Sequence, residues 1–295
     1  MQFTPLNKVQ QLWLKMKSTK AYKDYKFLHK LQGVQHPEIS ALSPTDVYFK
    51  HSGNAGDIIY SLPAIYALSK GRNIHLYLHI NQEAKHRLEH PLGNVMLNEK
   101  MVSLLHPLLL YQPQFKTCTL YTGQPIDVDL DAFRNYPFNY SMGHIARWYF
   151  LAFGINADLG KPWLQASPDA SVKEAIVIAR SKRYRAPGIH YQFLNQYPHI
   201  VFLGLKDEYE DMKKAIPHLI YRPVADFFEM ACVIAGSKLF IGNQSFPFSL
   251  AEALKVTRLL EVYHQTPNVI VEGASGYDFC YQPQFEKLVA QLYRP

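Results

Sequence analysis

The stretch KHSGNAGDIIYSLPAIYAL, residues 50–68, passes from a strand-like run into a helix-like run through two glycines and one acid, Asp57. Such a junction is either a plain turn or a ligand site, because the first N–H groups of a helix have no partner within the helix. The sequence on either side decides between these interpretations.

Length and composition indicate a folded protein of two domains. The chain has 295 residues, of which 48% are hydrophobic, more than one typical core needs. A charged fraction of 19% with 14% aromatic residues argues against disorder. No apolar run approaches the ~20 residues of a membrane span, and no apolar h-region follows the start, so we expect no signal sequence. The three cysteines are far apart in sequence, so we expect reduced thiols in the cytoplasm.

The net charge of +7 lies almost entirely in the first 30 residues. This segment holds seven lysines and a single acid, Asp24. A protein that binds duplex nucleic acid needs basic residues spread over its body, so this distribution argues against nucleic acid as the partner.

Residues 7–33 read as one or two amphipathic helices, in which lysines alternate with apolar stripes. The stripes are Val9, Leu12, Trp13 and Met16, followed by Tyr22, Tyr25 and Leu28. One interpretation is a helical appendage that packs on the body and turns a basic face to solvent. The other is attraction of the appendage to an anionic membrane surface.

From residue 46 onward, strand-like and helix-like segments alternate, and a connection at 154–171, rich in turn-forming residues, separates two such runs. This alternation predicts parallel sheets with helices on both faces. We therefore expect an α/β fold of two doubly wound, Rossmann-like domains that face a cleft. The expected boundaries are 1–40 for the appendage, 41–160 for the first domain and 161–295 for the second. Ligands of such folds bind in loops at the carboxyl ends of the strands.

The second half has a junction of the same character in FIGNQSFPFSLAEAL, residues 240–254. A strand ends at Gly242, and a helix with an early proline begins after Ser245. Free N–H groups and the positive end of the helix dipole make an anion site, where Asn243, Gln244 and Ser245 would bond phosphate oxygens. Ordinary helix capping by Ser245 is the alternative.

Together the two junctions resemble those of the bacterial heptosyltransferases, glycosyltransferase family 9. Gly56, Asp57, Pro63 and Ala64 match the family's N-terminal signature of Gly-Asp, five further residues and Pro-Ala. The segment GNQSFPFSLAEA is similar to its C-terminal motif, Gly-Asn-Asp-Ser-Gly-Pro-Met-His-Leu-Ala-Ala-Ala. The resemblance covers residues 46–295.

Several positions depart from the C-terminal motif. They include Gln244 for an acid, Phe246 for glycine, Ser249 for histidine and Glu252 for alanine. The chain thus resembles a divergent or sister member, and the family's donor nucleotide and sugar do not carry over. The resemblance implies the GT-B architecture, in which the first domain binds the acceptor and the second a nucleotide-diphosphate sugar. It also implies that no metal or other cofactor is needed.

In that family the aspartate that matches Asp57 is the proposed catalytic base, which takes the proton of the acceptor hydroxyl. We predict Asp57 for this role and Asp131 as the second candidate, with helix capping as the other interpretation of Asp57. His51 is a further candidate because histidine titrates near neutral pH. The predicted substrate-binding residues of the first half are Asn54, Gly56, Arg134 and His144.

Sugar transfer also requires that negative charge on the leaving diphosphate be stabilised. The segment ARSKRYR, residues 179–185, follows a strand and supplies cations for this purpose, unless it is a solvated basic loop. These cations are Arg180, Lys182, Arg183 and Arg185. Glu252, two turns into the second helix, would accept hydrogen bonds from the ribose hydroxyls, unless it faces solvent.

Three acids, Asp127, Asp129 and Asp131, alternate along a predicted strand and so share one face. Metal binding there is the alternative to a metal-independent site. The 13 histidines form no ligand cluster in the sequence.

The sequence therefore predicts a metal-independent, inverting glycosyltransferase of the hexosyl- or heptosyltransferase type. Its donor is a nucleotide-diphosphate sugar, and its acceptor is a hydroxyl of a glycan or glycolipid, such as lipopolysaccharide. We expect it in the cytoplasm, peripheral on the inner face of the membrane. The alternatives are a non-catalytic nucleotide-sugar-binding module, a GT-B enzyme that acts on DNA bases, and an epimerase of nucleotide sugars.

Overall fold

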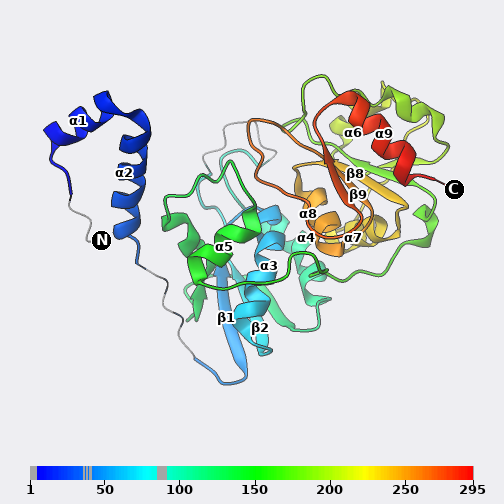
Figure 1. Cartoon of the computed structure of the whole chain (residues 1–295). Helices are drawn as coiled ribbons and strands as arrows, with labels where there is room; N and C mark the ends of the chain where they lie inside the picture. The colour runs from blue at the N-terminus through cyan, green and yellow to red at the C-terminus, as the bar shows by residue number, and fades with distance from the viewer. Residues whose placement is uncertain (1–4, 36, 38, 40–41, 85–91, 295) are drawn as a thin grey trace.

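The computed structural model of the chain describes residues 5–35, 37, 39, 42–84 and 92–294. Within these residues it forms two parallel sheets, one in each half of the molecule, preceded by a helical appendage (Figure 1). The predicted α/β class with two Rossmann-like halves is confirmed. The predicted boundary at residues 40–41 lies outside the described residues, and that at 160–161 falls in the connection between the halves.

The first half is built around a sheet of strand order β3-β2-β1-β4. Along β1 and β2 buried and partly exposed residues alternate, because successive side chains of a strand point to opposite faces. The buried side chains, such as Phe49 and Leu76, pack in one core with α3, α4 and α5. The elements are β1 (Asp46–His51), α3 (Ala55–Ser69), β2 (Asn73–Leu78), α4 (Glu99–Leu110), β3 (Phe115–Leu120), β4 (Val128–Asp129), η1 (Leu130–Asn135) and α5 (Ile145–Phe153).

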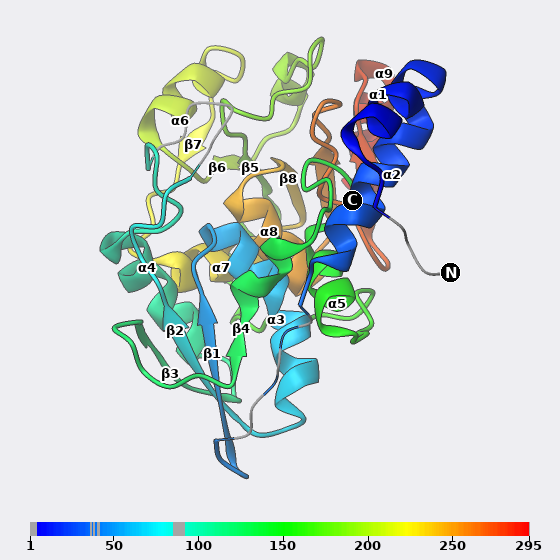
Figure 2. The same cartoon turned by 90° about the vertical axis from the view of Figure 1, so that its left-hand side faces the viewer.

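The other face of this sheet carries no helix among the described residues. Crossovers between parallel strands are right-handed, so the two steps from β1 to β2 to β3 place α3 and α4 on the same face. The return from β3 to β4, on the opposite edge, runs through residues 121–127, which contain no helix. Figure 2 views the sheet from this side, with β1 drawn in front of α3. The first half thus departs from the expected cover of helices on both faces.

The second half is built around a sheet of order β10-β9-β8-β5-β6-β7. Its central strands β5 and β8 are buried throughout, because α7 and α8 cover one face and α6 and α9 the other. The strand order reverses between β5 and β8, so their loops form the switch point at which such sheets bind ligands. The elements are η2 (Ala170–Val172), β5 (Ile176–Ala179), η3 (Gln192–Gln196), β6 (Ile200–Phe202), α6 (Lys206–Lys213), β7 (Ile220–Tyr221), α7 (Phe227–Gly236), β8 (Leu239–Asn243), α8 (Phe246–Leu254), β9 (Arg258–Glu261), β10 (Gly276–Phe279) and α9 (Gln282–Leu292).

The two halves meet where α3 and α8 begin. A Cβ atom placed on Gly56, in the first turn of α3, would lie 4.0 Å from the Cα atom of Phe246, in the first turn of α8. The two predicted junctions therefore face each other across the boundary between the halves.

A proline inside α3 ties this helix to the connection between the halves. Pro63 lies within α3, which begins at Ala55. Proline has no N–H for the carbonyl group four residues earlier. The indole Nε1 of Trp163 donates to that carbonyl, of Ile59, at 3.2 Å. The connection thus supplies the hydrogen bond that the proline cannot.

The appendage consists of α1 (Lys8–Lys17) and α2 (Thr19–Gln32), which Figure 1 shows standing apart from the two sheets. Helix α1 buries no residue, and α2 buries only Tyr25. Val9 and Met16 are 77% and 80% exposed, so the apolar stripe of α1 faces solvent. The interpretation that these helices pack on the body is therefore wrong. No helix among the described residues combines the length and the apolar character needed to cross a membrane.

Candidate functional site

The first predicted turn lies at the carboxyl end of β1 and leads into α3. Asn54 is the N-cap residue of α3, and its backbone N–H donates to Oδ2 of Asp57 at 3.2 Å. Asp57 lies in the first turn, where the positive end of the helix dipole stabilises a carboxylate. Its side chain is 23% exposed, so a bound molecule can reach it.

A cation and a second carboxylate lie beside Asp57. Nη2 of Arg134 is 3.9 Å from Oδ2 of Asp57, and Nη1 of Arg134 donates to Asp131. Asp131 also accepts the backbone N–H of Ser52 at 3.1 Å. Burial by itself would raise the pKa of Asp131, but the nearby His51 and Arg134 outweigh it and the pKa lies below its usual value. The structure therefore brings both predicted catalytic carboxylates together around Arg134.

His51 is fully buried next to this cluster. Its Nδ1 accepts the backbone N–H of Gly53 at 2.8 Å, and its Nε2 lies 2.8 Å from the hydroxyl of Tyr149. Burial lowers the pKa of His51 to about 4, so the ring is neutral near pH 7. A buried ring with both nitrogens bonded cannot take a proton from a bound acceptor. The interpretation of His51 as a base is wrong, and the ring instead fixes the turn.

The acids Asp127, Asp129 and Asp131 do not converge on one point. Asp127 is buried and accepts backbone N–H groups, Asp129 accepts a hydrogen bond from Lys50 Nζ at 2.6 Å, and Asp131 is held by its arginine. In the part of the chain that the structure describes, no three His, Cys, Asp or Glu side chains are grouped as a metal ion requires. This geometry contradicts the alternative of a metal site at these acids.

The second predicted turn lies at the carboxyl end of β8, at the switch point. Gly242 is needed there, because a Cβ atom would lie 2.8 Å from Cε1 of Phe240. Ser245 is the N-cap residue of α8, but its side chain makes no capping hydrogen bond. The interpretation of Ser245 as an ordinary helix cap is therefore wrong. The amino end of α8, with Ser245 as its N-cap residue, therefore faces the boundary between the halves.

The other two side chains of this turn are bonded to the protein. Asn243 is fully buried; its Oδ1 accepts the N–H of Ser181 at 3.1 Å and its Nδ2 donates to the Ser181 carbonyl at 2.8 Å. Gln244 is also buried and bonds residues 263–268, accepting the N–H of Tyr263 at 2.7 Å. The prediction that these side chains bond phosphate oxygens is wrong. They fix the neighbouring loops instead.

Three of the four predicted cations are paired with carboxylates. Arg180 is buried and donates two hydrogen bonds to Glu261, both of 2.6 Å. Lys182 and Arg185 form ion pairs with acids of α6. Nε and Nη2 of Arg180 are thus bonded within the protein, so Arg180 anchors its loop, and phosphate binding by this residue stays a prediction.

Arg183 is the remaining cation, and no described carboxylate lies within ion-pair distance of it. Its Nε atom is buried and has no hydrogen-bond partner among the described residues. Burial lowers the pKa of Arg183, while Tyr184, Glu208 and Asp57 act in the opposite direction. Asp57 belongs to the first half. The turn that carries Asp57 and the loop that carries Arg183 therefore lie within electrostatic reach of each other across the boundary.

Two predicted substrate contacts lie in the interior. Glu252 on α8 has no exposed surface, accepts a hydrogen bond from Nε of Arg258 at 2.6 Å and pairs with Lys255. His144 is the buried N-cap residue of α5 and accepts the N–H of Ala146 at 3.1 Å. The predictions that Glu252 binds ribose and that His144 contacts the acceptor are wrong.

Glu261, at the end of β9, is a residue that the sequence-based prediction left out. It is fully buried and accepts hydrogen bonds from Arg180, from the Tyr191 hydroxyl at 2.9 Å and from the Ala186 N–H at 2.7 Å. These bonds fix the loop that carries Arg183. Its place at the carboxyl end of a predicted strand was the signal that could have found it.

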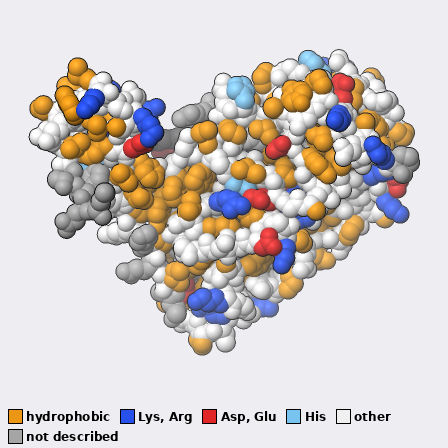
Figure 3. All heavy atoms as spheres, in the orientation of Figure 1, with side chains coloured by type: hydrophobic (Ala, Val, Ile, Leu, Met, Phe, Trp, Pro, Cys, Tyr) orange, Lys and Arg blue, Asp and Glu red, His pale blue; other side chains and the backbone are white. Residues whose placement is uncertain are grey.

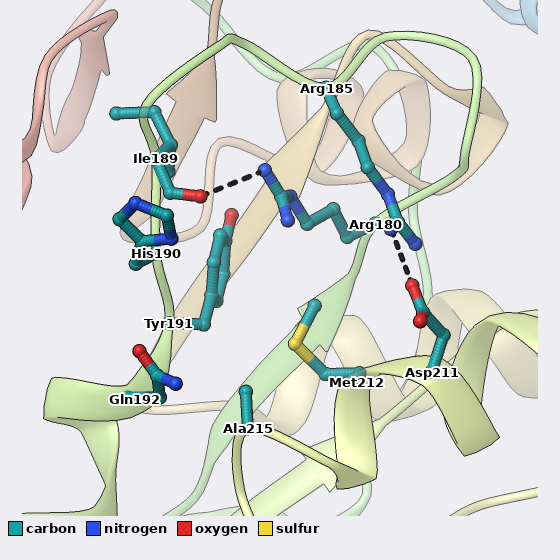
Figure 4. Close-up of a pocket in the computed structure, with 9 residues that line it drawn as sticks. All are labelled: Arg180, Arg185, Ile189, His190, Tyr191, Gln192, Asp211, Met212 and Ala215. Carbon is teal, nitrogen blue, oxygen red and sulfur yellow. Dashed lines mark hydrogen bonds and ion pairs between the residues drawn. The ribbon is translucent and has the colours of Figure 1, made fainter.

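A cavity of about 180 Å³ lies beside the same loop. All of its lining residues lie between Arg180 and Ala215, in the second half. Figure 4 shows Arg185 extended toward Asp211 and Arg180 toward the carbonyl of Ile189. The cavity is therefore distinct from the boundary that Asp57 and Arg183 share.

Two parallel-sheet halves whose strand-to-helix turns face each other define the GT-B fold. Solved structures of glycosyltransferases share it. The glycosyl transferase family 9 structure from Veillonella parvula DSM 2008 matches with a TM-score of 0.51 and 11% identity, over 87% of this chain and 91% of that chain. E. coli heptosyltransferase WaaC with ADP matches with a TM-score of 0.55 and 10% identity, over 84% of this chain and 100% of that one.

A third structure, E. coli ADP-heptose lps heptosyltransferase II, matches with a TM-score of 0.50 and 13% identity, over 84% of this chain and 98% of that chain. At these identities the likeness establishes the fold, and it is the fold that the resemblance to glycosyltransferase family 9 implies. No protein-family model matches the chain, and no curated protein matches it significantly.

Proposed function

We propose that the chain is an inverting glycosyltransferase that moves a sugar from a nucleotide-diphosphate sugar to a hydroxyl of a glycan or glycolipid, without a metal ion. The relation between Asp57 and Arg183 carries this proposal. A carboxylate that can accept a proton and a half-buried cation without a described carboxylate partner lie within electrostatic reach across the boundary between the halves. Sugar transfer needs both charges, one for the acceptor and one for the leaving group.

Asp57 acts on the acceptor in this proposal. The acceptor oxygen forms a bond to the anomeric carbon on the face opposite the diphosphate, so the configuration inverts, and its proton passes to the Asp57 carboxylate. Arg134, whose Nη2 lies 3.9 Å from Oδ2 of Asp57, orients that carboxylate. The amino end of α3 supports the same charge.

Arg183 acts on the donor. As the bond between the anomeric carbon and the diphosphate oxygen breaks, negative charge grows on the diphosphate. The Arg183 guanidinium can donate two hydrogen bonds to it, and the amino end of α8, with the Ser245 hydroxyl, adds to the stabilisation. A buried guanidinium nitrogen without a partner is costly, and a bound anion would remove that cost.

Two similar structures guide the choice of donor and acceptor. The WaaC structure contains ADP, and the other E. coli protein is described as an ADP-heptose lipopolysaccharide heptosyltransferase. ADP-sugars are therefore the first donors to test, and a lipopolysaccharide core or another bacterial glycan is the first acceptor.

A thermal-shift panel of ADP-, UDP-, GDP-, CMP- and dTDP-sugars tests the proposal. A ligand at a hundred times its dissociation constant adds ~2.7 kcal/mol of stability. With the responding donor, Asp57→Asn should keep the shift but lose at least a hundredfold in transfer. The control Asp278→Asn changes an exposed acid of β10 and should keep both. No response to any nucleotide sugar would overturn the proposal.

A non-catalytic nucleotide-sugar-binding module is the second candidate. The bonding of Asn243 and Gln244 to the protein favours it, because fewer side chains remain to stabilise a leaving group. It predicts a thermal response to one nucleotide sugar and no transfer by the unmodified protein to any acceptor.

We place the protein in the cytoplasm, with its appendage on the inner face of an anionic membrane. Leu12 and Trp13 are each 60% exposed among lysines, and Figure 3 shows apolar surface on the appendage and on the adjoining part of the body.

The protein should co-sediment with phosphatidylglycerol vesicles but not with pure phosphatidylcholine. Leu12→Glu with Trp13→Glu should abolish this, whereas Leu205→Glu, at a residue 46% exposed in the second half, should not. Equal sedimentation of both variants would contradict the assignment.

A further inference from the structure

The uncovered face of the first sheet is polar and aromatic. Parallel sheets are normally covered on both faces, because their strands are apolar throughout. Here the residues that alternate with the buried ones are half-buried and polar or aromatic. They are Asp46, Tyr48 and Lys50 on β1, Asn73, His75 and Tyr77 on β2, Thr117 on β3 and Tyr121 directly after it. We name this set the open face.

Hydrogen bonds and ring stacking hold the open face in place. His75 is 3.1 Å from Asp46 through Nε2 and 2.9 Å from the Thr117 hydroxyl through Nδ1. The Tyr48 ring stacks on His75 at 4.7 Å and on Tyr77 at 6.2 Å between centroids. Among the described residues, no hydrogen-bond partner is found for the hydroxyls of Tyr48 and Tyr77. Two phenols fixed side by side, with unused hydroxyls, form a preorganised polar surface.

The open face continues into the candidate site. Lys50 stands on β1 two residues after Tyr48, an advance of about 6.6 Å along the strand. Its ammonium bonds Asp129 at 2.6 Å, lies 3.8 Å from Asp131 and is 5.6 Å from the centre of the Tyr121 ring. Asp131 in turn shares Arg134 with Asp57. A chain of contacts thus runs from Tyr77 through Tyr121 and Lys50 toward the proposed base.

The composition of the open face favours a polar ligand. None of the large apolar residues that are exposed in the described part of the chain lies on β1, β2 or β3. A stable interface between protein copies needs an apolar centre, which is missing here. The charges are mixed, with Lys50 beside Asp129, so a polymer held mainly by its charge, such as a nucleic acid, is not favoured either. Hydroxyls, an ammonium group and ring edges suit a ligand rich in hydroxyl groups.

We propose that the open face binds the acceptor: an extended glycan lies along β1 and β2, with its terminal hydroxyl at Asp57. This inference rests on the proposed function and deepens it, because it makes the acceptor an oligosaccharide several sugars long. Tyr48 and Tyr77 bind the inner sugars, and the carboxyl edge of the sheet receives the outermost one. Helices α1 and α2 lie to one side of this face and leave β1 uncovered (Figure 2).

The test is binding of deacylated lipopolysaccharide core oligosaccharide by titration calorimetry, without any nucleotide sugar present. Tyr48→Ala with Tyr77→Ala should weaken this binding at least tenfold. Tyr277→Ala with Tyr281→Ala is the matched control, since these tyrosines are 38% and 57% exposed on the other half, and should leave binding unchanged. Tyr48→Phe with Tyr77→Phe keeps the rings and should weaken binding severalfold, which provides a readout if the alanine variant fails to fold.

Equal affinity of the unmodified and the Tyr48/Tyr77 variants would overturn the inference, as would absence of oligosaccharide binding by the unmodified protein. A dimer in sedimentation that the variants convert to a monomer would assign the face to a second copy and overturn it too. None of these results changes the thermal response to nucleotide sugars, which tests the proposed function separately. The failure of this inference and that of the proposed function are therefore distinguishable.

Discussion

The indole N–H of Trp163 donates to the carbonyl oxygen of Ile59 at 3.2 Å. Ile59 lies on α3 two residues after Asp57, and Trp163 lies in the connection that leads to the second half. The hydrogen bond therefore couples that connection to the helix that carries the proposed base. It also satisfies a carbonyl that Pro63 leaves without its helical partner.

Trp163→Phe should lower the free energy of unfolding by ~1–3 kcal/mol, because the buried Ile59 carbonyl would lose its donor. Urea unfolding followed by circular dichroism measures this. Trp13→Phe is the control, since Trp13 is 60% exposed on the appendage. Equal stability of both variants would mean that this hydrogen bond contributes nothing.

Arg183→Gln should lose nucleotide-sugar binding, whereas Arg180→Gln should lose stability. Arg183→Gln should weaken binding of the responding nucleotide sugar by ten- to a hundredfold, at unchanged stability, because charge-assisted hydrogen bonds are worth ~1.5–3 kcal/mol. Arg180→Gln leaves Glu261 buried without its cation and should destabilise by ~3–5 kcal/mol. Calorimetry and urea unfolding separate the two effects. If Arg183→Gln binds donor normally, Arg183 is not the diphosphate ligand.

Glu252→Gln should cost stability and leave donor binding intact. The change removes the charge that balances buried Arg258 and Lys255, so a loss of ~3–5 kcal/mol is expected from urea unfolding. Glu210→Gln, at an acid 55% exposed on α6, is the control. Weaker nucleotide-sugar binding by a folded Glu252→Gln protein would restore its predicted contact with ribose.

Stability should fall as the pH drops from about 6.5 to about 4. Burial lowers the pKa of both His51 and His144 to about 4, from the ordinary value of 6.5. Between these values the unfolded chain binds protons that the folded chain does not, so acid favours unfolding. At pH 5 each histidine should cost about 2 kcal/mol relative to pH 7. His144→Asn keeps a side chain that caps helices and should shrink this loss. An unchanged loss would assign it to other groups.

Both turns could be predicted from the sequence because their signals are local. Glycine at a strand end, an acid in the first helical turn and a proline at an early helical position each mark where a helix begins. Asp57 and Ser245 lie where those signals place them. The two Rossmann-like halves could be predicted for the same reason, because the alternation of strands and helices is also read from local segments.

The pairing of charges could not be predicted, because it depends on strands that are distant in sequence. Arg180 and Glu261 are 81 residues apart, and they meet only because the sheet brings the ends of β5 and β9 to one edge. Glu252 and His144 carry polar groups typical of binding sites, yet both side chains point inward. Arg183, in the same short segment as Arg180, stays without a carboxylate partner among the described residues. Sequence offers no means of telling these two arginines apart.

Glu261 also constrains how the protein is made. The ribosome releases the segment from Arg180 to Ala186 long before Glu261, and domains generally fold as they emerge, amino end first. Until β9 leaves the exit tunnel, that segment lacks the carboxylate that fixes it. A nascent chain halted before residue 261 would carry this loop without its anchor, so the loop takes its final place only after β9 has been translated.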